Sequence, residues 1–412
     1  MNNDLKSYVD SPDPSYRWES LSSMRLKQGS LHDLRLVSQT WQRIEWRHRI
    51  HVYLPDHVLS THWGLLSIGH DHINAPGQTE LDLELASQAG IVCIHLYDIP
   101  NQPLFEGMRE DELLAFTLAQ RLETDDATWP LLFPMVKAAM RALDCAAAFC
   151  KQIGANAPDR FIVHGASKRG WTAWLLAAFD GRVGAIMPEV YDNLNLAAQM
   201  PHQVKMWHGY SEMIEDYTEQ HLQDKMRTPR GHELAGSVDP YTFRADLAVP
   251  KLLIHGLSDR YWATDALNLY WDDLPGDKHV VYAPNQGHHI ADRSAVLPTQ
   301  AAFIGAIVGD TCLPVISGEY VETESELCLV VQTSAPGMEA RIWTAASETQ
   351  DFRESEWISQ PLAPSANRLQ FTGTIRRPVS GFLAVVADVL FPNEDLPYLQ
   401  STQVRILESR TY

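Results

Sequence analysis

The sequence HGASKRGW at positions 164–171 contains a serine whose surroundings suit nucleophilic chemistry. It follows an apolar, strand-like run and precedes a helical pattern, so Ser167 falls at a junction between a strand and a helix. A sharp turn at such a junction lifts the hydroxyl out of the sheet and tolerates only small neighbours, which Gly165 and Ala166 provide. The backbone N–H of Lys168 can then face a developing oxyanion near the start of the helix. We therefore predict that Ser167 is a nucleophile; the alternative is a serine that caps the helix.

Two cations follow this serine directly. The usual nucleophile motif is GxSxG, but Arg169 stands where its second glycine is expected, and Gly170 comes one position later. Arginine recognises carboxylates with two parallel hydrogen bonds, so Arg169 is a candidate substrate-binding residue. Lys168 and Arg169 can equally form ion pairs with the many acidic residues of the chain. The sequence leaves both interpretations open.

A nucleophilic serine needs a base to accept its proton, and that base needs an acid to orient it. In mostly parallel sheets with a serine at such a turn, the chain order is serine, acid, histidine. Asp259 lies in the loop after a strand predicted at 251–255, and His288 follows a glycine after the last predicted strand of this series. We predict that Ser167, Asp259 and His288 form a catalytic triad.

Each partner has an alternative. Asp192 follows a strand predicted at 183–188 and competes for the position of the acid. His289 stands beside His288, although the glycine-histidine turn favours the first of the two. Asp259 on its own is also compatible with a cap for a helix that begins near Ala263.

A second oxyanion donor is expected in the loop after the apolar run at 63–68. That loop begins Gly69-His-Asp-His72, and the backbone N–H groups of His70 and Asp71 are the candidates. Three ionisable side chains in immediate succession cannot all face one ion from the end of a strand. We therefore predict no metal here, and acyl transfer by a triad requires no cofactor.

Aromatic residues are frequent near the predicted catalytic residues. Trp207 falls in a region between predicted strands, and Tyr261 and Trp262 come directly after the predicted acid, so these three are candidates for substrate binding. Trp171 and Trp174 have helical spacing and are expected in the core.

The elements that must position these residues alternate between strands and helices. After an antiparallel pair, short apolar runs alternate with helical patterns such as 80–88 and 131–151, which predicts an α/β fold with a mostly parallel sheet covered by helices on both faces. The antiparallel pair is predicted at 34–41 and 46–54, and further strands at 63–68, 91–96, 160–163, 183–188, 251–255 and 280–283. The alternation stops between 190 and 245, where we expect a helical lid insertion.

The last hundred residues have a different character. Short alternating segments are separated by turn residues, at 327–333, 340–345, 369–375 and 381–387, and long helical patterns are absent from the sequence there. We predict a catalytic domain at 1–309 and an all-β sandwich at 310–412.

The composition limits the classes of partner. The chain has 52 acidic and 33 basic residues and a formal charge of −19, which would repel phosphate backbones and anionic membranes. We therefore expect a small-molecule or peptide substrate and no nucleic acid; the sequence does not predict an oligomeric state. The five cysteines form no CxxC pair and no zinc pattern, and we expect buried thiols. The N-terminal sequence shows no signal-peptide pattern, and apolar runs long enough to span a membrane are absent, so we expect a cytoplasmic protein.

Several segments together resemble one known family. GASKRGWTAW, WPLLFPMVKAAMRALD from Trp129, HGLSDRYW around Asp259 and DDLPGDKHVVYAPNQGHH are similar to the PhoPQ-activated pathogenicity-related (PqaA-like) proteins, over nearly the whole chain. The resemblance implies an α/β-hydrolase fold with Ser167, Asp259 and His288 as the triad and a smaller C-terminal β domain. The better-known members of that family look exported. The GxSxxG spacing with a cation directly after the serine is also similar to glucuronoyl esterases, which implies an ester that bears a carboxylate.

These features predict a serine hydrolase that cleaves an ester or amide through an acyl-enzyme. One alternative is a peptidase that resembles the prolyl oligopeptidase class, which shares the fold and the chain order. The other is a protein that binds a ligand on a hydrolase scaffold without turnover, which Arg169 in place of glycine favours.

Overall fold

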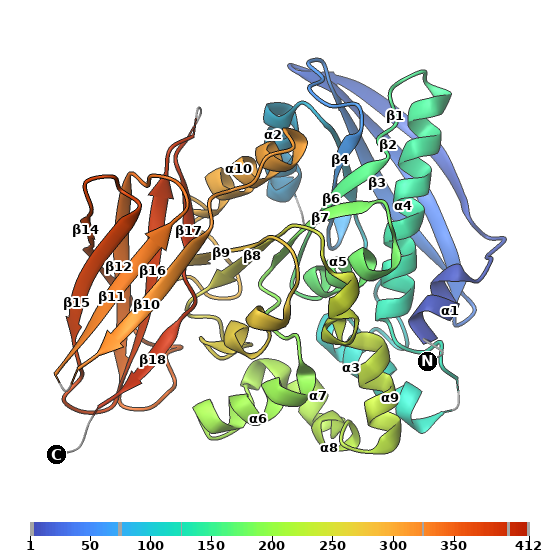
Figure 1. The fold of residues 1–412 in the computed structure, drawn as a ribbon. Coiled ribbons are helices and arrows are strands. Elements are labelled where there is room, and N and C mark those ends of the chain that lie inside the picture. Colours follow the sequence, from blue (N-terminus) through green and yellow to red (C-terminus); the bar gives the residue numbers. More distant parts are fainter. Residues whose placement is uncertain (1–3, 73–75, 125, 324, 394–395, 410–412) are drawn as a thin grey trace. The chain divides into compact units, whose positions relative to one another are not determined.

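The computed structural model describes residues 4–72, 76–124, 126–323, 325–393 and 396–409 (Figure 1). The chain forms two compact units. The first comprises Met1–Tyr191 and Ile214–Pro250, and the second comprises Asp192–Met213 and Lys251–Tyr412.

The first unit is built on a mixed sheet with the strand order β1-β2-β3-β5-β4-β6-β7. Its antiparallel part contains β1 to β3 and the pairing of β3 with β5, whereas β5, β4, β6 and β7 run parallel. Side chains of the parallel strands are buried almost without interruption, as expected for strands covered on both faces. The strands are β1 (Arg17–Leu26), β2 (Gly29–Trp41), β3 (Ile44–Pro55), β4 (Trp63–Ile68), β5 (Val92–Leu96), β6 (Arg160–Ala166) and β7 (Val183–Glu189).

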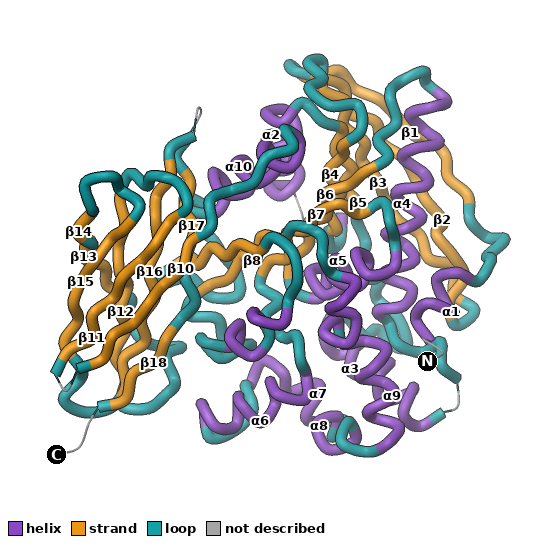
Figure 2. Tube along the Cα trace, in the orientation of Figure 1, coloured by secondary structure: helices purple, strands orange, loops and turns teal. Residues whose placement is uncertain are grey.

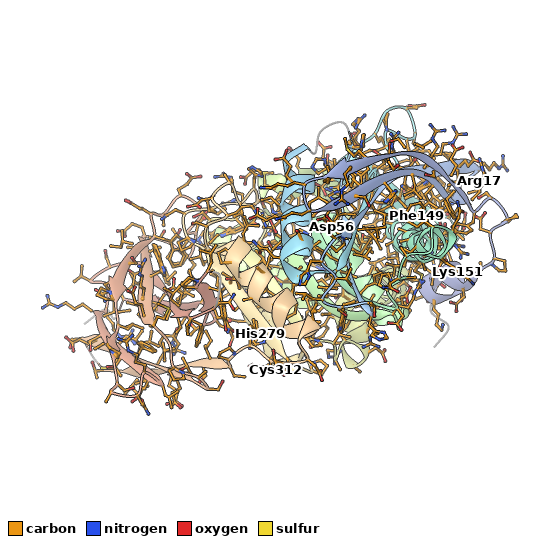
Figure 3. All side chains as sticks on the ribbon, turned by 90° about the horizontal axis from the view of Figure 1, so that it is seen from above. Arg17, Asp56, Phe149, Lys151, His279 and Cys312 are labelled. Atoms are coloured by element: carbon orange, nitrogen blue, oxygen red, sulfur yellow. The ribbon has the colours of Figure 1, made fainter. Side chains whose placement is uncertain are left out.

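Helices cover this sheet. The longest, α4, packs along β2 and β3 (Figure 1) and carries Phe149, which is labelled in Figure 3. The Phe149 ring centre lies 6.2 Å from that of Trp18 and 5.0 Å from that of His32. The α-helices of the unit are α1 (Asp4–Asp10), α2 (Pro76–Ala89), α3 (Glu110–Glu123), α4 (Leu132–Gln152), α5 (Lys168–Phe179), α7 (Glu215–Glu219), α8 (Leu222–Lys225) and α9 (Pro229–Val238).

The second unit begins with α6 (Leu196–Trp207) and continues with a parallel pair, β8 (Lys251–Gly256) and β9 (Lys278–Ala283), and with α10 (Val296–Val308). From β10 onward the described chain is drawn as strands and loops (Figure 2). These strands form two separate antiparallel sheets, β10-β11-β15-β14 and β13-β12-β16-β17, with β18 also paired to β16. They are β10 (Ile316–Glu322), β11 (Glu326–Thr333), β12 (Glu339–Ser347), β13 (Ile358–Pro361), β14 (Ala363–Pro364), β15 (Gln370–Arg376), β16 (Phe382–Phe391), β17 (Tyr398–Ser401) and β18 (Arg405–Glu408).

Side-chain contacts join β9 and α10 to the C-terminal sheets within this unit. His279 Nδ1 lies 2.7 Å from Gln400 Oε1, and its position on β9 is marked in Figure 3. Thr299 Oγ1 donates to Leu399 O at 2.9 Å and accepts from Leu399 N at 3.1 Å. The C-terminal sheets therefore share buried polar contacts with the elements that precede them.

The predicted fold class is confirmed: a mostly parallel sheet with helices, followed by separate antiparallel sheets. The region 190–245, where a lid was predicted, contains α6 to α9, and its residues are divided between the two units. Among the described residues, no helix has the length and hydropathy needed to cross a membrane.

Candidate active site

Ser167 occupies a strained turn between β6 and α5. Its backbone has φ 57° and ψ −126°, a combination that residues other than glycine rarely adopt. The turn is held on both sides: Ser167 N–H donates to Glu189 O at 2.8 Å, and Trp171 N–H donates to Ser167 O at 3.0 Å. The side chain of Ser167 makes no capping hydrogen bond to α5, which is unlike an ordinary N-cap serine.

Two glycines explain the unusual spacing of the motif. A Cβ at Gly165 would lie 2.5 Å from Arg169 O, and a Cβ at Gly170 would lie 2.9 Å from Gly165 O. The first turn of α5 therefore passes very close to the end of β6. Gly170 serves this close approach one position after the place where GxSxG has its second glycine.

The candidate oxyanion donors lie at the same edge of the first unit as Ser167. The register of β4 and β6 pairs Ile68 with Gly165, so the loop after β4 and the turn after β6 leave neighbouring strands together. Lys168 is the first residue of α5, where a backbone N–H has no acceptor within the helix. Gly69 N–H donates to Leu96 O at 2.7 Å, which leaves the N–H groups of His70 and Asp71 as candidates in this loop.

The side chains of this loop are held in different ways. The Asp71 carboxylate accepts from Gln102 at 3.1 Å and from Arg109 at 2.8 Å. His70 is exposed, yet partial burial of its ring and the nearby Arg169 charge lower its pKa. At neutral pH the His70 imidazole is therefore uncharged.

The two cations after Ser167 are paired with acids. Lys168, only 6% exposed, lies 2.8 Å from a Glu110 oxygen and 3.3 Å from Asp111. Arg169, 7% exposed, donates to both Glu110 oxygens at 2.8 and 2.6 Å, and its Nε donates to Ile99 O at 2.6 Å. Burial alone would raise the pKa of Glu110, but the Arg169 and Lys168 charges outweigh it and lower that pKa. Of the two interpretations, the geometry favours ion pairing, and it leaves Arg169 little freedom to bind a substrate carboxylate.

Asp259 and His288 meet in the second unit. His288 Nδ1 lies 2.9 Å from Asp259 Oδ2, and Asp259 Oδ1 accepts from the backbone N–H of Tyr261 at 2.8 Å. Asp259 is 6% exposed, whereas the His288 side chain is 23% exposed, so the imidazole reaches solvent from a buried anchor. When Nδ1 donates to the carboxylate, Nε2 remains as the basic nitrogen.

A glycine allows the two loops to approach. A Cβ at Gly256, the last residue of β8, would lie 2.3 Å from Gly287 O and 2.5 Å from Gln286 O. The loop that carries His288 therefore rests directly on the end of the strand that leads to Asp259.

The competing residues occupy other environments. The buried carboxylate of Asp192 accepts from the Tyr270 hydroxyl at 2.6 Å. Burial, with help from the charges of Asp259 and Asp265, raises the pKa of Asp192 to about 7. His289 is exposed, whereas its neighbour His288 pairs with Asp259.

The three aromatic candidates differ in their contacts. The ring of Tyr261 lies 4.0 Å from that of His288, and Trp262 lies 5.7 Å from Tyr261. The ring of Trp207 lies under the Arg353 guanidinium at 4.2 Å. Tyr261 is therefore the candidate in direct contact with the histidine.

Sequence reasoning missed a buried polar row beneath Ser167. The register places Ser67 opposite both His95 and His164 on neighbouring strands. His95 Nδ1 lies 2.6 Å from Asp82, Ser67 Oγ lies 3.5 Å from His164 Nδ1, and His164 Nε2 lies 3.2 Å from Glu189. Single polar residues near the carboxyl ends of apolar strands were the available signal.

Ser167 belongs to the first unit, and Asp259 and His288 belong to the second. Each unit therefore contains one part of the predicted catalytic machinery. The first has a strained serine with candidate oxyanion donors, and the second has an oriented histidine.

Comparison with known proteins gives a matching family, a curated relative and similar solved structures. Residues 5–353 match the PhoPQ-activated pathogenicity-related protein family, which confirms the resemblance stated from the motifs. The chain is 30% identical over 374 residues to Autocrine proliferation repressor protein A of Dictyostelium discoideum, a match that covers 85% of this chain and 76% of that protein.

Two of the similar solved structures are acetyl xylan esterases of low sequence identity. Acetyl xylan esterase 1 of Thermoanaerobacterium sp. JW/SL YS485 has a TM-score of 0.52 at 14% identity, covering 74% of this chain and 92% of that one. An acetyl xylan esterase of Paenibacillus sp. R4 has a TM-score of 0.49 at 15% identity, covering 69% and 87%. The first of these similarities supports the α/β-hydrolase fold.

Proposed function

The chain belongs to the PhoPQ-activated pathogenicity-related protein family, and we propose that it is a serine hydrolase that cleaves an ester or amide bond. In this proposal Ser167 is the nucleophile, His288 is the general base and Asp259 orients the imidazole. The observation that carries it is the backbone of Ser167, held at φ 57° and ψ −126° after β6. Strain of this kind persists only where the surrounding structure maintains it, and it is typical of a nucleophile turn.

The proposed reaction has two acyl-transfer steps. Ser167 Oγ attacks the substrate carbonyl carbon while its proton passes to His288 Nε2, and the carbonyl oxygen becomes an oxyanion. The N–H of Lys168 and that of His70 or Asp71 stabilise this oxyanion. The tetrahedral species expels the alcohol or amine, which takes the proton from His288, and water then releases the acid from Ser167 by the reverse sequence of proton transfers.

The pairing of Asp259 with His288 supports this assignment of roles. A carboxylate on Nδ1 holds the neutral imidazole with Nε2 unprotonated, and it stabilises the imidazolium that forms during attack. The 4.0 Å contact of the Tyr261 ring with the imidazole supports Tyr261 as part of the proposed substrate site.

A fluorophosphonate probe tests the proposal on the intact chain. We expect a covalent adduct at Ser167 and none in Ser167→Ala. We expect His288→Ala to react at least ~1,000-fold more slowly, because the hydroxyl then lacks its base. His289→Ala is the matched control and should react at the wild-type rate. A wild-type chain that forms no adduct at Ser167 would leave the non-catalytic ligand-binding alternative.

The leaving group separates an esterase from a peptidase. Rates on p-nitrophenyl esters and on aminoacyl anilides are compared with the same enzyme preparation. Turnover of esters alone supports an esterase, and turnover of anilides at a similar kcat/KM supports the alternative that resembles prolyl oligopeptidases. Ser167→Ala provides the background rate for both substrates.

A further inference from the structure

We propose that residues 351–357, which lie between β12 and β13 in the C-terminal sheets, form a positioning segment for Asp259 and His288. The positioning residues are Asn285 and Arg353. The inference rests on the proposed function, because it assigns the C-terminal sheets a role in holding the catalytic base and its acid.

The first contact reaches the loop of the histidine. Asn285 Nδ2 donates to Trp357 O at 2.9 Å, and Trp357 N–H donates to Asn285 Oδ1 at 2.8 Å. Asn285 has φ 58° and stands three residues before His288. The indole of Trp357 is buried, at 2% exposure, so this pair of hydrogen bonds joins the histidine loop to a fixed point.

The second contact reaches the loop of the acid. Arg260 follows Asp259 directly, and its guanidinium pairs with Glu212 at 2.6 Å and with Glu354. Arg353 pairs with the other oxygen of Glu212 at 2.8 Å. Glu212 thus bridges an arginine of the acid loop and an arginine of the positioning segment.

Arg353 is itself held rigidly. It donates to both oxygens of Asp351, at 2.9 and 2.6 Å, and its guanidinium lies 4.2 Å from the centre of the Trp207 ring. Its side chain is 15% exposed, so its charge is screened less by solvent than that of a surface arginine.

The end of α6 completes the support of the acid loop. Gln203 Nε2 donates to Tyr261 O at 2.8 Å, and Gln203 Oε1 accepts from Ser211 N–H at 2.9 Å. Ser211 Oγ also donates to Arg260 O. Trp207 lies between Gln203 and Ser211 in the chain, and Glu212 follows Ser211 directly, so Arg353 contacts the same segment that holds the backbone after Asp259.

Proton transfer is sensitive to such support. A general base must stay within hydrogen-bond reach of the hydroxyl, and a displacement of about 1 Å can cost on the order of 100-fold in rate. Loops alone rarely hold a side chain that closely, which is why supporting contacts affect the rate as well as stability. The positioning segment supplies them to both loops at once.

Asn285→Gly tests the histidine side in the full chain. Glycine keeps the positive φ and removes both hydrogen bonds to Trp357. We expect kcat on a p-nitrophenyl ester and the labelling rate at Ser167 to fall together by about 10- to 100-fold, with KM within about twofold and the melting temperature little changed. Asp310→Gly is the matched control, because Asp310 also has a positive φ, of 52°, and lies outside these loops. Wild-type rates in Asn285→Gly would overturn the proposal.

Two further variants keep the test decisive if Asn285→Gly folds poorly. Asn285→Asp keeps the acceptor for Trp357 N–H and loses the donor, so we expect a smaller loss, about 3- to 10-fold, at nearly native stability. Arg353→Met keeps apolar contact with Trp207 and removes the positive charge that pairs with Glu212. We expect the same loss in rate, about 3- to 10-fold. Equal kcat in both variants and the wild type would overturn the proposal.

Failure of the proposed function would be recognised separately. In that case the wild-type chain itself would not be labelled at Ser167. Hydrogen exchange then measures directly how firmly the histidine loop is held. Faster exchange of amides 286–290 in Asn285→Gly than in Asp310→Gly supports the positioning role of Asn285, and equal exchange overturns it.

Discussion

At the level of single residues, Ser167 combines the two properties expected of a nucleophile, a strained backbone and a side chain that does not cap its helix. Such strain costs on the order of 1–3 kcal/mol and is maintained by the contacts around it. Here those contacts include the hydrogen bond of Ser167 N–H to Glu189 O and the close approach of Gly165 to Arg169.

We expect Ser167→Gly to be more stable than Ser167→Ala by about 1 kcal/mol, because glycine relieves the backbone strain at φ 57°. The greater conformational freedom of glycine in the unfolded state offsets only part of this stabilisation. Urea unfolding measures the difference, and neither variant should be labelled by a fluorophosphonate. Ser237, within α9, is the control: there glycine should be less stable than alanine by about 1 kcal/mol. Equal stability of the two variants at 167 would contradict a strained turn.

Asp192 gives the chain a specific dependence of stability on pH. The pKa of its carboxyl is raised from 3.8 to about 7, chiefly by burial, with contributions from the charges of Asp259 and Asp265. The folded state therefore keeps a proton between about pH 4 and 7 that the unfolded state has lost. The free energy of unfolding must then fall as the pH rises through this window.

Asp192→Asn should remove this part of the dependence while its side-chain oxygen still accepts from Tyr270. We expect the variant to gain stability relative to the wild type as pH rises from 4 to 7, by up to about 4 kcal/mol. Urea unfolding at a series of pH values measures the gain. Asp246→Asn, at an exposed position, is the control for the removal of one carboxylate. A constant difference between Asp192→Asn and the wild type across this range would show that Asp192 titrates normally.

At the level of elements, the parallel strands of the first unit carry a polar row just below the nucleophile turn. Burying Ser67, His95, His164 and Glu189 in apolar strands is tolerated only because each finds a partner on a neighbouring element. Burial would raise the pKa of Asp82, but its bond to His95 outweighs this and lowers it. The row thus stabilises the ends of four strands that lead to Ser167 and to the candidate oxyanion loop.

We expect Ser67→Ala to lower the free energy of unfolding by about 1–3 kcal/mol, because it leaves His164 Nδ1 without this partner in a buried position. Chemical denaturation measures the loss. Ser22→Ala is the matched change on β1, where the hydroxyl is exposed and lies 3.4 Å from Asp33, and it should alter stability by less than about 0.5 kcal/mol. Similar values for the two variants would show that the polar row adds no stability.

At the level of the whole molecule, the second unit joins β8, β9 and α10 to the C-terminal sheets through side chains. Asn268 donates to Val404 O at 2.9 Å and Tyr282 N–H donates to Ser401 Oγ at 3.0 Å, in addition to the contacts of His279 and Thr299. The predicted boundary at 309 falls inside this compact unit.

A chain that ends at Gly309 should therefore fail to unfold cooperatively, because the polar groups of His279, Tyr282 and Thr299 would lose their partners. Thermal melting followed by near-ultraviolet circular dichroism, compared with the full chain, measures this. We expect a broad transition and no labelling at Ser167. A sharp melt with retained labelling would show that residues 1–309 fold independently.

The local pattern of the sequence was sufficient to predict many of the strands of this molecule. The antiparallel opening pair, the apolar parallel strands and the alternating C-terminal strands were predicted because each depends on the period of side chains along a single segment. Ser167, Asp259 and His288 were singled out because residue type and position at the ends of strands are visible in one dimension.

The sequence did not show which of these residues pair with one another. Whether Arg169 pairs with Glu110, whether Asp192 or Asp259 meets His288, and whether Asn285 bonds to Trp357 depend on which distant segments pack together. Charge and hydrogen-bonding capacity are properties of a residue and can be read from the chain, whereas their use depends on distances of a few ångströms between segments far apart in sequence. Those distances are set by packing of the complete fold, which is why the roles of these residues emerge only in three dimensions.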